Sequence, residues 1–305
     1  MNGIINVYKE KGFTSHDVVA KLRGILHMKK IGHTGTLDPD AVGVLPVCLG
    51  KGTGLVSMIT DWTKTYEAVM LLGTTTDTQD TSGTVLTQSA VEVDERTVLE
   101  VCSQFEGEYD QIPPMYSALK VNGKKLYELA RAGVEVERKP RRVVINSLRV
   151  NDINLEDDVK TVTITVDCSK GTYIRTLCDD IGKKLGCGAC MMLLKRTRVG
   201  DFVIDDTLTL NQIAALALKG EIEDYIVSID EMFSDYRKLT VDAVYNRLLY
   251  NGNKLPLEAI VSDGGEFLDM EKFRIYDAEG SFVGIYKYIG GQFVLEKMFY
   301  DNSDT

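Results

Sequence analysis

The chain has 305 residues, of which 44% are hydrophobic and 26% charged, a composition that suits a globular protein of two domains and excludes a membrane-spanning one. The formal net charge is −10, but residues 1–200 hold 26 basic and 25 acidic residues, whereas residues 201–305 hold 9 and 20. Without a signal-peptide pattern we expect a cytoplasmic protein, and six scattered cysteines with no histidine nearby predict reduced thiols and no metal site.

The first 54 residues predict a strand, a helix and a loop. Residues 3–10 are typical of a short strand, and residues 15–26 predict a helix that Thr14 or Ser15 caps, with its apolar residues on one face. Six glycines and two prolines between residues 31 and 54 predict a long ordered loop. Long ordered loops often carry function, so this segment is a candidate site.

The rest of the chain predicts an α+β fold with a mixed, mainly antiparallel sheet. Strands are expected at 64–72, 85–88 and 159–168, and helices at 94–105 and 172–185. Residues 113–142 read as an excursion from the core with one short helix. From about residue 240, short apolar runs and glycine turns at 277–280 and 290–291 predict a small β-rich module.

Basic residues of the first two-thirds occur in four clusters, which favours a nucleic-acid partner although the chain as a whole is acidic. An alternative interpretation of each cluster is a solvated surface. The clusters are Lys29 with Lys30; Lys120 with Lys124 and Lys125; Arg138, Lys139, Arg141 and Arg142; and Lys195, Arg196 and Arg198.

The strongest candidate for a reactive group is Asp38, in the run GHTGTLDPDAVGVLP. Asp before Pro is also typical of a simple turn, and DPDAV superficially matches the loop of aspartate-nucleophile phosphatases, which need an apolar strand before the aspartate and Mg²⁺. Neither a phosphate-binding GxxxxGK[ST] loop nor a GxGxxG motif is present, so no nucleotide cofactor is expected. The polar groups clustered between glycines favour a site over a turn.

This run closely resembles the central motif of the TruB family of pseudouridine synthases, which isomerise the T-loop uridine of tRNA. The resemblance extends over residues 1–235 through the segments KGFTSHDVV, KTYEAVMLLGTTTDTQDTSG, PPMYSALKVNGKKLYELARAG, SKGTYIRTLCDDIGKKLGCGA and LLKRTRVGDF. The C-terminal part resembles the PUA module that is often attached to these enzymes. The resemblance implies the pseudouridine synthase fold, conversion of uridine 55 to pseudouridine, and no cofactor.

It also implies three catalytic residues. Asp38 matches the carboxylate that forms a covalent intermediate, by attack on C6 of uracil or C1′ of ribose. Arg175 matches the arginine that pairs with it, although such a helix residue is more often an exposed salt-bridge partner. Tyr66 matches a tyrosine that stacks on the target base and whose hydroxyl can take the C5 proton.

Further positions match residues that hold RNA after the target base has flipped out of its stack. Tyr173 and Leu194 match the walls of the uracil pocket. His33 matches a histidine that holds or displaces bases, and Asp80 matches a carboxylate that bonds the rearranged loop.

The resemblance gives the expected domains: a catalytic domain at 1–238, a thumb-like insertion at 113–142 that closes on the T stem-loop with Lys124 and Lys125, and a PUA-like RNA-binding module at 239–305. It also implies a monomer. A competing hypothesis is an RNA-binding protein that keeps the fold without the chemistry, but such a protein could lose Asp38, Tyr66 and Arg175, all of which are present.

Overall fold

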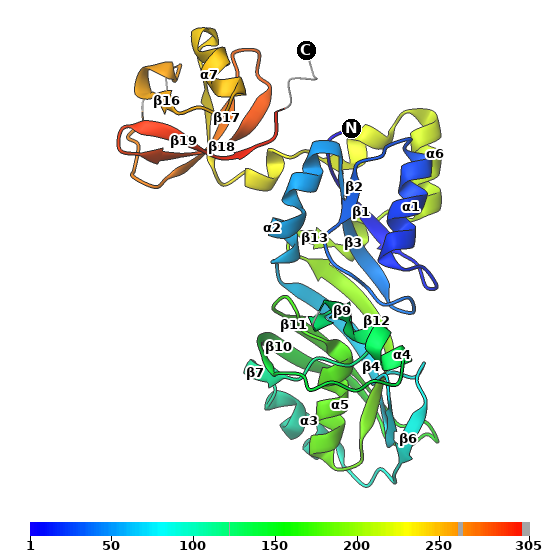
Figure 1. The fold of residues 1–305 in the computed structure, drawn as a ribbon. Coiled ribbons are helices and arrows are strands. Elements are labelled where there is room, and N and C mark those ends of the chain that lie inside the picture. The colour runs from blue at the N-terminus through cyan, green and yellow to red at the C-terminus, as the bar shows by residue number, and fades with distance from the viewer. Residues whose placement is uncertain (122, 262–264, 301–305) are drawn as a thin grey trace.

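Figure 1 shows the computed structural model, which describes residues 1–121, 123–261 and 265–300 as two sheets with helices around them. The larger sheet has ten strands, and its path follows the order β14 (Ile226–Val227), β1 (Gly3–Lys9), β3 (Val42–Leu49), β12 (Ala189–Val199), β4 (Lys64–Leu72), β11 (Thr161–Cys168), β10 (Arg141–Asn154) and β7 (Gly107–Gln111). Beside this path, β2 (Ile31–His33) pairs with β3 and β13 (Phe202–Val203) pairs with β12.

A five-stranded sheet forms the C-terminal module, in the order β15 (Arg237–Thr240), β17 (Lys272–Tyr276), β18 (Phe282–Ile289), β19 (Gln292–Met298) and β16 (Leu255–Pro256). Two small hairpins lie outside both sheets: β5 (Thr74–Thr76) with β6 (Val85–Gln88), and β8 (Lys120–Val121) with β9 (Lys124–Lys125). The α-helices are α1 (Ser15–Ile25), α2 (Val56–Thr60), α3 (Glu95–Ser103), α4 (Leu126–Arg131), α5 (Ile174–Leu185), α6 (Leu210–Lys219) and α7 (Asn246–Tyr250).

The two halves of the large sheet join where β3 and β12 run parallel; within the described residues, the other strand pairings of this sheet are antiparallel. Gly43 makes this approach possible. Its φ is +109°, and a Cβ at this position would lie 2.2 Å from the carbonyl oxygen of Arg196. The junction therefore brings the segment that precedes β3, which contains Asp38, next to the middle of β12.

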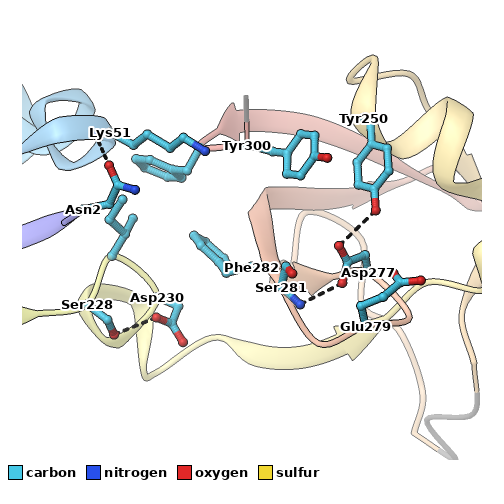
Figure 2. A pocket seen from close by; sticks show the side chains of 12 residues that line it. Asn2, Lys51, Ser228, Asp230, Tyr250, Asp277, Glu279, Ser281, Phe282 and Tyr300 are labelled. Atoms are coloured by element: carbon cyan, nitrogen blue, oxygen red, sulfur yellow. Dashed lines mark hydrogen bonds between the residues drawn. The ribbon is translucent and has the colours of Figure 1, made fainter. Parts of the chain in front are cut away.

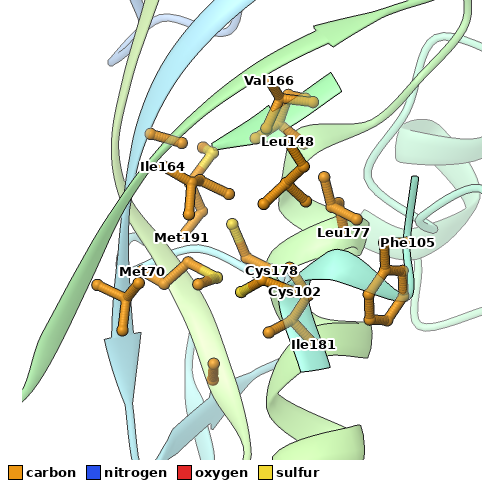
Figure 3. Close-up of a cluster of buried hydrophobic side chains, with 14 of the residues drawn as sticks. Met70, Cys102, Phe105, Leu148, Ile164, Val166, Leu177, Cys178, Ile181 and Met191 are labelled. Carbon is orange, nitrogen blue, oxygen red and sulfur yellow. The ribbon is translucent and has the colours of Figure 1, made fainter. Parts of the chain in front are cut away.

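One half of the sheet carries its core between the strands β4, β10, β11 and β12 and the helices α3 and α5 (Figure 3). Side chains from the sheet and from both helices pack together there, among them Met70, Ile164 and Met191 of the sheet, Leu177 and Ile181 of α5, and Cys102 of α3. Burial of each such large side chain stabilises the fold by about 1.5–3 kcal/mol. This packing fixes α5 against the sheet, and α5 carries Arg175 in its first turn.

Three further apolar clusters are found among the described residues, and the last of them is the module's own core around Leu239, Phe273 and Phe293. The helices α1 and α6 pack on β1 and β3, where Val18, Leu22 and Ile213 meet Ile5 and Val47. Another of these clusters joins the C-terminal module to the rest of the chain, because Ile285 and Phe299 of the module pack with residues of the large sheet and its helices.

The structure confirms the predicted α+β class and most of the predicted elements. Strand β11 alternates between buried and half-buried residues as the sequence indicates, and Thr14 caps α1 through a capping box with Asp17. The expected hairpins at 277–280 and 290–291 connect β17 with β18 and β18 with β19. Parts of the expected thumb and module, residues 122, 262–264 and 301–305, lie outside the described residues.

The expectation that residues 31–54 form one long loop is wrong, because this stretch contains β2, β3 and a 3₁₀ helix at Gly50–Leu55. The glycines and Pro46 suggested a loop, yet the apolar run Val42–Leu49 is almost entirely buried. Pro46 has no N–H to donate, and its carbonyl accepts bonds from the N–H (3.2 Å) and the hydroxyl (3.1 Å) of Thr34. The true loop is only the segment from residue 34 to residue 41.

Candidate active site

Asp38 lies in the loop between β2 and β3, at the centre of the large sheet. Two contacts fix this loop from within the fold: the Leu37 N–H donates to Ser15 Oγ at 2.9 Å, and the Ala41 N–H donates to the Asp38 carbonyl at 3.1 Å. The flanking residues Leu37 and Ala41 are buried, whereas 42% of the Asp38 side chain is exposed. The loop therefore presents a carboxylate to solvent from a rigid base.

Lys9, a fully buried lysine at the end of β1, supports the same loop. Its ammonium group donates to the carbonyl oxygens of Pro39 (3.0 Å), Ala41 (2.5 Å) and Glu10 (3.3 Å). Burial lowers the pKa of Lys9 to about 8, while the charges of Asp38 and Asp40 oppose that change. Sequence reasoning missed this residue; its signal was a lysine at the end of a mostly apolar strand.

Arg175 is buried and binds the Asp38 carboxylate with two nitrogens. Its Nε lies 3.0 Å from Asp38 Oδ2, and its Nη2 lies 3.5 Å from Asp38 Oδ1. The same guanidinium donates to the carbonyl oxygens of Thr78 (Nη1, 3.2 Å) and Tyr116 (Nη2, 2.9 Å), and Nη1 lies 3.7 Å from Asp80 Oδ2. Such a fork orients a carboxylate in a way that one ammonium group cannot. The predicted pairing of Arg175 with Asp38 is present in the geometry, and the exposed alternative is wrong.

The electrostatic environment of Asp38 is mixed. Burial of the carboxyl group among the surrounding elements is the largest effect and raises its pKa above the ordinary value. Arg175 and Lys9 act in the opposite direction, whereas the negative charges of Asp80 and Asp40 add to the increase. Displacement of Arg175 would therefore raise the pKa of Asp38 further.

Tyr66 lies on β4 opposite Val166 of β11 and Arg196 of β12, and only 9% of its surface is exposed. Burial raises its pKa, which keeps the hydroxyl protonated, while the charge of Arg196 and a hydrogen bond from it favour the ionised form. Tyr66 shares a buried cluster with Leu37 and Ala41, which lie on either side of Asp38 in its loop. This packing places Tyr66 beside the Asp38 loop.

Arg196 itself is 1% exposed, donating from Nε to the Val44 carbonyl (2.7 Å) and from Nη2 to the Gly35 carbonyl (3.4 Å). It supports the Asp38 loop and β3, a role that sequence reasoning missed. Arg198, in the same predicted basic cluster, forms an ion pair with Asp167. Arg196 is therefore a buried structural residue and Arg198 is paired within the fold, so this basic cluster exposes less positive charge than its sequence suggests.

The cluster at 138–142 is also partly neutralised, since Arg142 pairs with Asp110 at 2.8 Å and Glu108 at 2.7 Å. Lys29, Lys30 and Lys124 remain exposed. Lys125, next to Lys124 in β9, donates to the hydroxyl of Tyr127 at 3.2 Å. Lys124 and Lys125 thus belong to the 113–142 excursion, and among the described residues neither forms a hydrogen bond or ion pair with the Asp38 loop.

Tyr173 and Leu194 are both half-buried. Tyr173 precedes α5, and its backbone is held by the side chain of Gln111, which accepts from the Tyr173 N–H (2.7 Å) and donates to its carbonyl (3.0 Å). Burial raises the pKa of Tyr173, with small effects from Arg175 and Asp38 nearby. Leu194 lies opposite Ala68 in the sheet and packs against the core.

Asp80 is 17% exposed, and its Oδ1 accepts from the Thr78 hydroxyl (2.7 Å) and the Ser82 N–H (3.0 Å). Asp80 therefore lies in the site and faces Arg175. His33 lies at the end of β2 opposite Val47, and burial lowers its pKa, so that the neutral imidazole is favoured. Its buried Nδ1 has no hydrogen-bond partner within the described residues.

A separate cavity of about 570 Å³ lies between the 3₁₀ helix after β3 and the C-terminal module (Figure 2). Its lining includes the carboxylates Asp230, Asp277 and Glu279 beside the stacked rings of Tyr250 and Tyr300. Three carboxylates disfavour a phosphate group there, and none of the predicted site residues lines this cavity. The candidate active site is therefore the one at Asp38 and not this cavity.

Neither a metal centre nor a membrane span is found in the part of the chain that the structure describes. No group of three or more His, Cys, Asp or Glu side chains there could hold a metal ion. No helix among the same residues is long and apolar enough to cross a membrane.

Comparison with known proteins agrees with this geometry. Residues 23–174 match the family described as "TruB family pseudouridylate synthase (N terminal domain)", and residues 175–234 match "tRNA pseudouridylate synthase B C-terminal domain". A tRNA pseudouridine synthase B of Lachnoclostridium phytofermentans is 52% identical over 94% of this chain and 95% of its own length. One from Clostridium perfringens strain SM101 is 43% identical over 98% of this chain and 99% of its own length.

Solved structures show the same fold. A chain in the crystal structure of a Cbf5-Nop10-Gar1 complex superimposes with a TM-score of 0.70 at 28% identity, covering 99% of this chain and 86% of that one. A chain in an H/ACA RNP bound to a substrate RNA containing 2′-deoxyuridine gives a TM-score of 0.68 at 26% identity, with 98% and 85% covered. On these matches, the chain belongs to the TruB family and is an enzyme that forms pseudouridine in tRNA.

Proposed function

We propose that this enzyme converts uridine 55 in the T loop of tRNA into pseudouridine, with Asp38 as the covalent catalyst. The observation that carries the proposal is the carboxylate of Asp38, which is open to solvent on one side and bound by Arg175 on the other. A nucleophile needs such a combination of access and orientation. A protein that only binds RNA has no need of a buried arginine at this carboxylate.

Pseudouridine formation breaks the N1–C1′ bond, turns the uracil and joins C1′ to C5, with no oxidation or reduction. The Asp38 carboxylate adds to an electrophilic carbon, either C6 of uracil or C1′ of ribose, and leaves in a later step. Arg175 and Lys9 favour the ionised carboxylate against the burial that raises its pKa. Because the net reaction only rearranges bonds within one nucleotide and Asp38 is regenerated, no cofactor is required.

Formation of the C5–C1′ bond leaves a proton on C5 that must be removed. The Tyr66 hydroxyl is our candidate for this transfer, since it lies in the Asp38 site and its pKa responds to both Arg196 and Asp38. Its raised pKa keeps it protonated, so it acts as a relay that takes the C5 proton as it passes its own to water. N1, released from C1′, takes up a proton from water, so the isomerisation is proton-neutral overall. Its ring stacks on the displaced base.

The target uridine must first flip out of its stack, which costs a few kcal/mol. We propose that Tyr173 and Leu194 form the walls of the uracil pocket and exclude water from it. His33 and Asp80 contact bases of the opened loop, and Asp80 also faces the Arg175 guanidinium.

We further propose the division into a catalytic domain at 1–238, a thumb at 113–142 and an RNA-binding module at 239–305, working as a monomer. The module is built on its own five-stranded sheet that starts with β15. In the thumb, exposed Lys124 and its neighbour Lys125 contact phosphates of the T stem-loop. Since residues 201–305 hold 9 basic and 20 acidic residues, the module adds little electrostatic attraction.

The position of the reaction can be tested with two tRNA transcripts, one tritiated at C5 of uridine 55 only and the other at C5 of uridine 54 only. In EDTA, we expect the enzyme to release tritium from the first transcript and not from the second. No release from a well-folded sample would contradict isomerisation at this site, and release from the second transcript alone would contradict the position.

A further inference from the structure

The backbone of Gln79, in the loop between β5 and β6, adopts a conformation that is rare for its residue type. Its φ is +63°, in the left-handed region that glutamine seldom occupies. Two backbone bonds accompany it, from the Gln79 N–H to the Thr76 carbonyl (3.2 Å) and from the Met191 N–H to the Gln79 carbonyl (3.0 Å). Such conformations persist only where surrounding contacts hold them, and they are concentrated at functional sites.

The side chain of Gln79 is clamped to α5. Its Nε2 donates to Asp179 Oδ2 at 2.9 Å, and its Oε1 accepts from the Thr176 hydroxyl at 2.7 Å. Both partners are buried, and Asp179 also pairs with Lys183 one turn further along α5. Both functional groups of the amide are therefore used, and both point to the helix that carries Arg175.

The neighbours of Gln79 on both sides contact Arg175. The Thr78 carbonyl accepts from Arg175 Nη1 at 3.2 Å, and Asp80 Oδ2 lies 3.7 Å from the same nitrogen. A rotation of the backbone at Gln79 would move both acceptors away from the guanidinium. The remaining nitrogens of Arg175 are the ones that hold Asp38, so a tilt of the guanidinium would change the Asp38 contact directly.

We propose that Gln79 is a positioning residue for the isomerisation: its amide binds the Thr78–Asp80 turn to α5 and thereby keeps the Arg175 guanidinium in contact with the Asp38 carboxylate. The inference rests on the proposed roles of Asp38 and Arg175. Gln79 touches neither of these side chains, and it acts through the turn that it clamps. Its contribution is thus to the rate of the chemical step and not to the affinity for RNA.

The test uses the full-length enzyme and single-turnover tritium release from the T stem-loop at saturating enzyme. Gln79→Gly keeps the left-handed backbone accessible but removes both side-chain bonds. Gln79→Glu keeps the shape but replaces the donor by an oxygen that faces the Asp179 carboxylate. We expect each variant to slow the reaction by about 10- to 100-fold, with the Kd for RNA within about 2-fold of wild type.

The double variant Gln79→Glu with Asp179→Asn restores the bond with donor and acceptor exchanged. We expect it to recover the rate to within about 5-fold of wild type. His27→Gly is the matched control, since His27 is exposed and also has a positive φ of +51°; it should keep the wild-type rate.

The acid limb of the pH–rate profile gives another readout that general destabilisation would not move. Groups that act on the charge of Asp38 are Arg175 of α5, Lys9 of β1, Asp40 of its own loop and Asp80 of the β5–β6 loop, with the hydroxyls of Tyr66 and Tyr173 nearby. When the Gln79 clamp is lost and Arg175 shifts, the acid limb should move to higher pH, and the double variant should move it back.

Wild-type rates in both single variants would overturn the proposal. A loss of rate that the double variant does not recover would also overturn it, and so would a loss of rate that is matched by an equal loss of RNA affinity. Failure of the underlying assignment is distinguishable. If Asp38→Asn is inactive while the Gln79 variants are fully active, only the positioning role is wrong. If Asp38→Asn retains turnover, the proposed function itself is wrong.

Discussion

Arg175→Lys tests how much the fork geometry at Asp38 contributes beyond a positive charge. The guanidinium holds Asp38 with two nitrogens, at 3.0 and 3.5 Å, and also binds the carbonyls of Thr78 and Tyr116. An ammonium group keeps the charge but has one nitrogen in place of three. It can reach the Asp38 carboxylate or the two carbonyls, but not all of these acceptors together.

The structure sets the size of the expected effect. Hydrogen bonds to charged groups contribute about 1.5–3 kcal/mol each, and because Lys keeps the positive charge we take about 1.5–2 kcal/mol for each of the two lost bonds, or about 3–4 kcal/mol together. If that loss falls on the transition state, the single-turnover rate decreases by about 100- to 1000-fold. The pKa of Asp38, already raised by burial, rises further because its nearest cation is less well placed, so the acid limb of the rate moves to higher pH.

The assay is single-turnover tritium release from a T stem-loop labelled at uracil C5, measured across pH, together with RNA binding. Arg96→Lys is the control, since the Nε of Arg96 also binds a carboxylate, that of Glu100 at 2.8 Å, but on the exposed surface of α3. It should leave the rate unchanged. If Arg175→Lys reacted as fast as Arg96→Lys, the orientation of Asp38 by the fork would be refuted.

Three further perturbations test other parts of the site. Lys9→Met should destabilise the fold by about 1–3 kcal/mol, because buried carbonyls of the Asp38 loop lose their donor. Folding lowers the pKa of Lys9 from 10.5 to about 8, so between pH 8 and 10.5 the unfolded chain binds more protons than the folded one. The wild type should therefore gain stability relative to Lys9→Met as the pH rises through this range. If chemical denaturation gave the same change of unfolding free energy with pH for both proteins, this expectation would be contradicted. Tyr66→Phe should slow tritium release by about 100-fold without a loss of RNA binding. A wild-type rate would show that the Tyr66 hydroxyl takes no part in the proton transfer and that the ring only stacks on the base. Replacing Lys124 and Lys125 with Ala should weaken RNA binding and flatten its dependence on salt, with an unchanged salt slope as the contradicting result.

The elements with regular apolar patterns could be predicted from the sequence. The helices α1, α3 and α5 and the strand β11 have clear periodicity, and all lie where expected within a few residues. Strand β3 could not be predicted, because Gly43 and Pro46 are typical of loops. Its formation depends on the close approach to β12 and on the Thr34 bonds to Pro46, and neither contact has a local signal.

The same distinction applies to the site. Asp38, Asp80 and Arg175 were proposed from the resemblance of their motifs, and the structure brings them into contact. Gln79 and Arg196 also lie in matching segments, but the resemblance assigned them no role. Gln79 acts through a backbone conformation, and Arg196 belongs to a basic run that is typical of an exposed surface. Their roles depend on tertiary contacts between segments about 100 or more residues apart, which sequence periodicity does not encode.

The central claim is that Asp38 is the carboxylate that attacks the uridine, and Asp38→Asn tests it most directly. The measurement is tritium release from the T stem-loop in EDTA, with RNA affinity measured in parallel and Asp40→Asn, two residues along the same loop and exposed, as the control. Asp38→Asn should release no tritium and bind RNA with nearly wild-type affinity, while Asp40→Asn stays active. Turnover near the wild-type rate in Asp38→Asn would show that another group does the covalent chemistry.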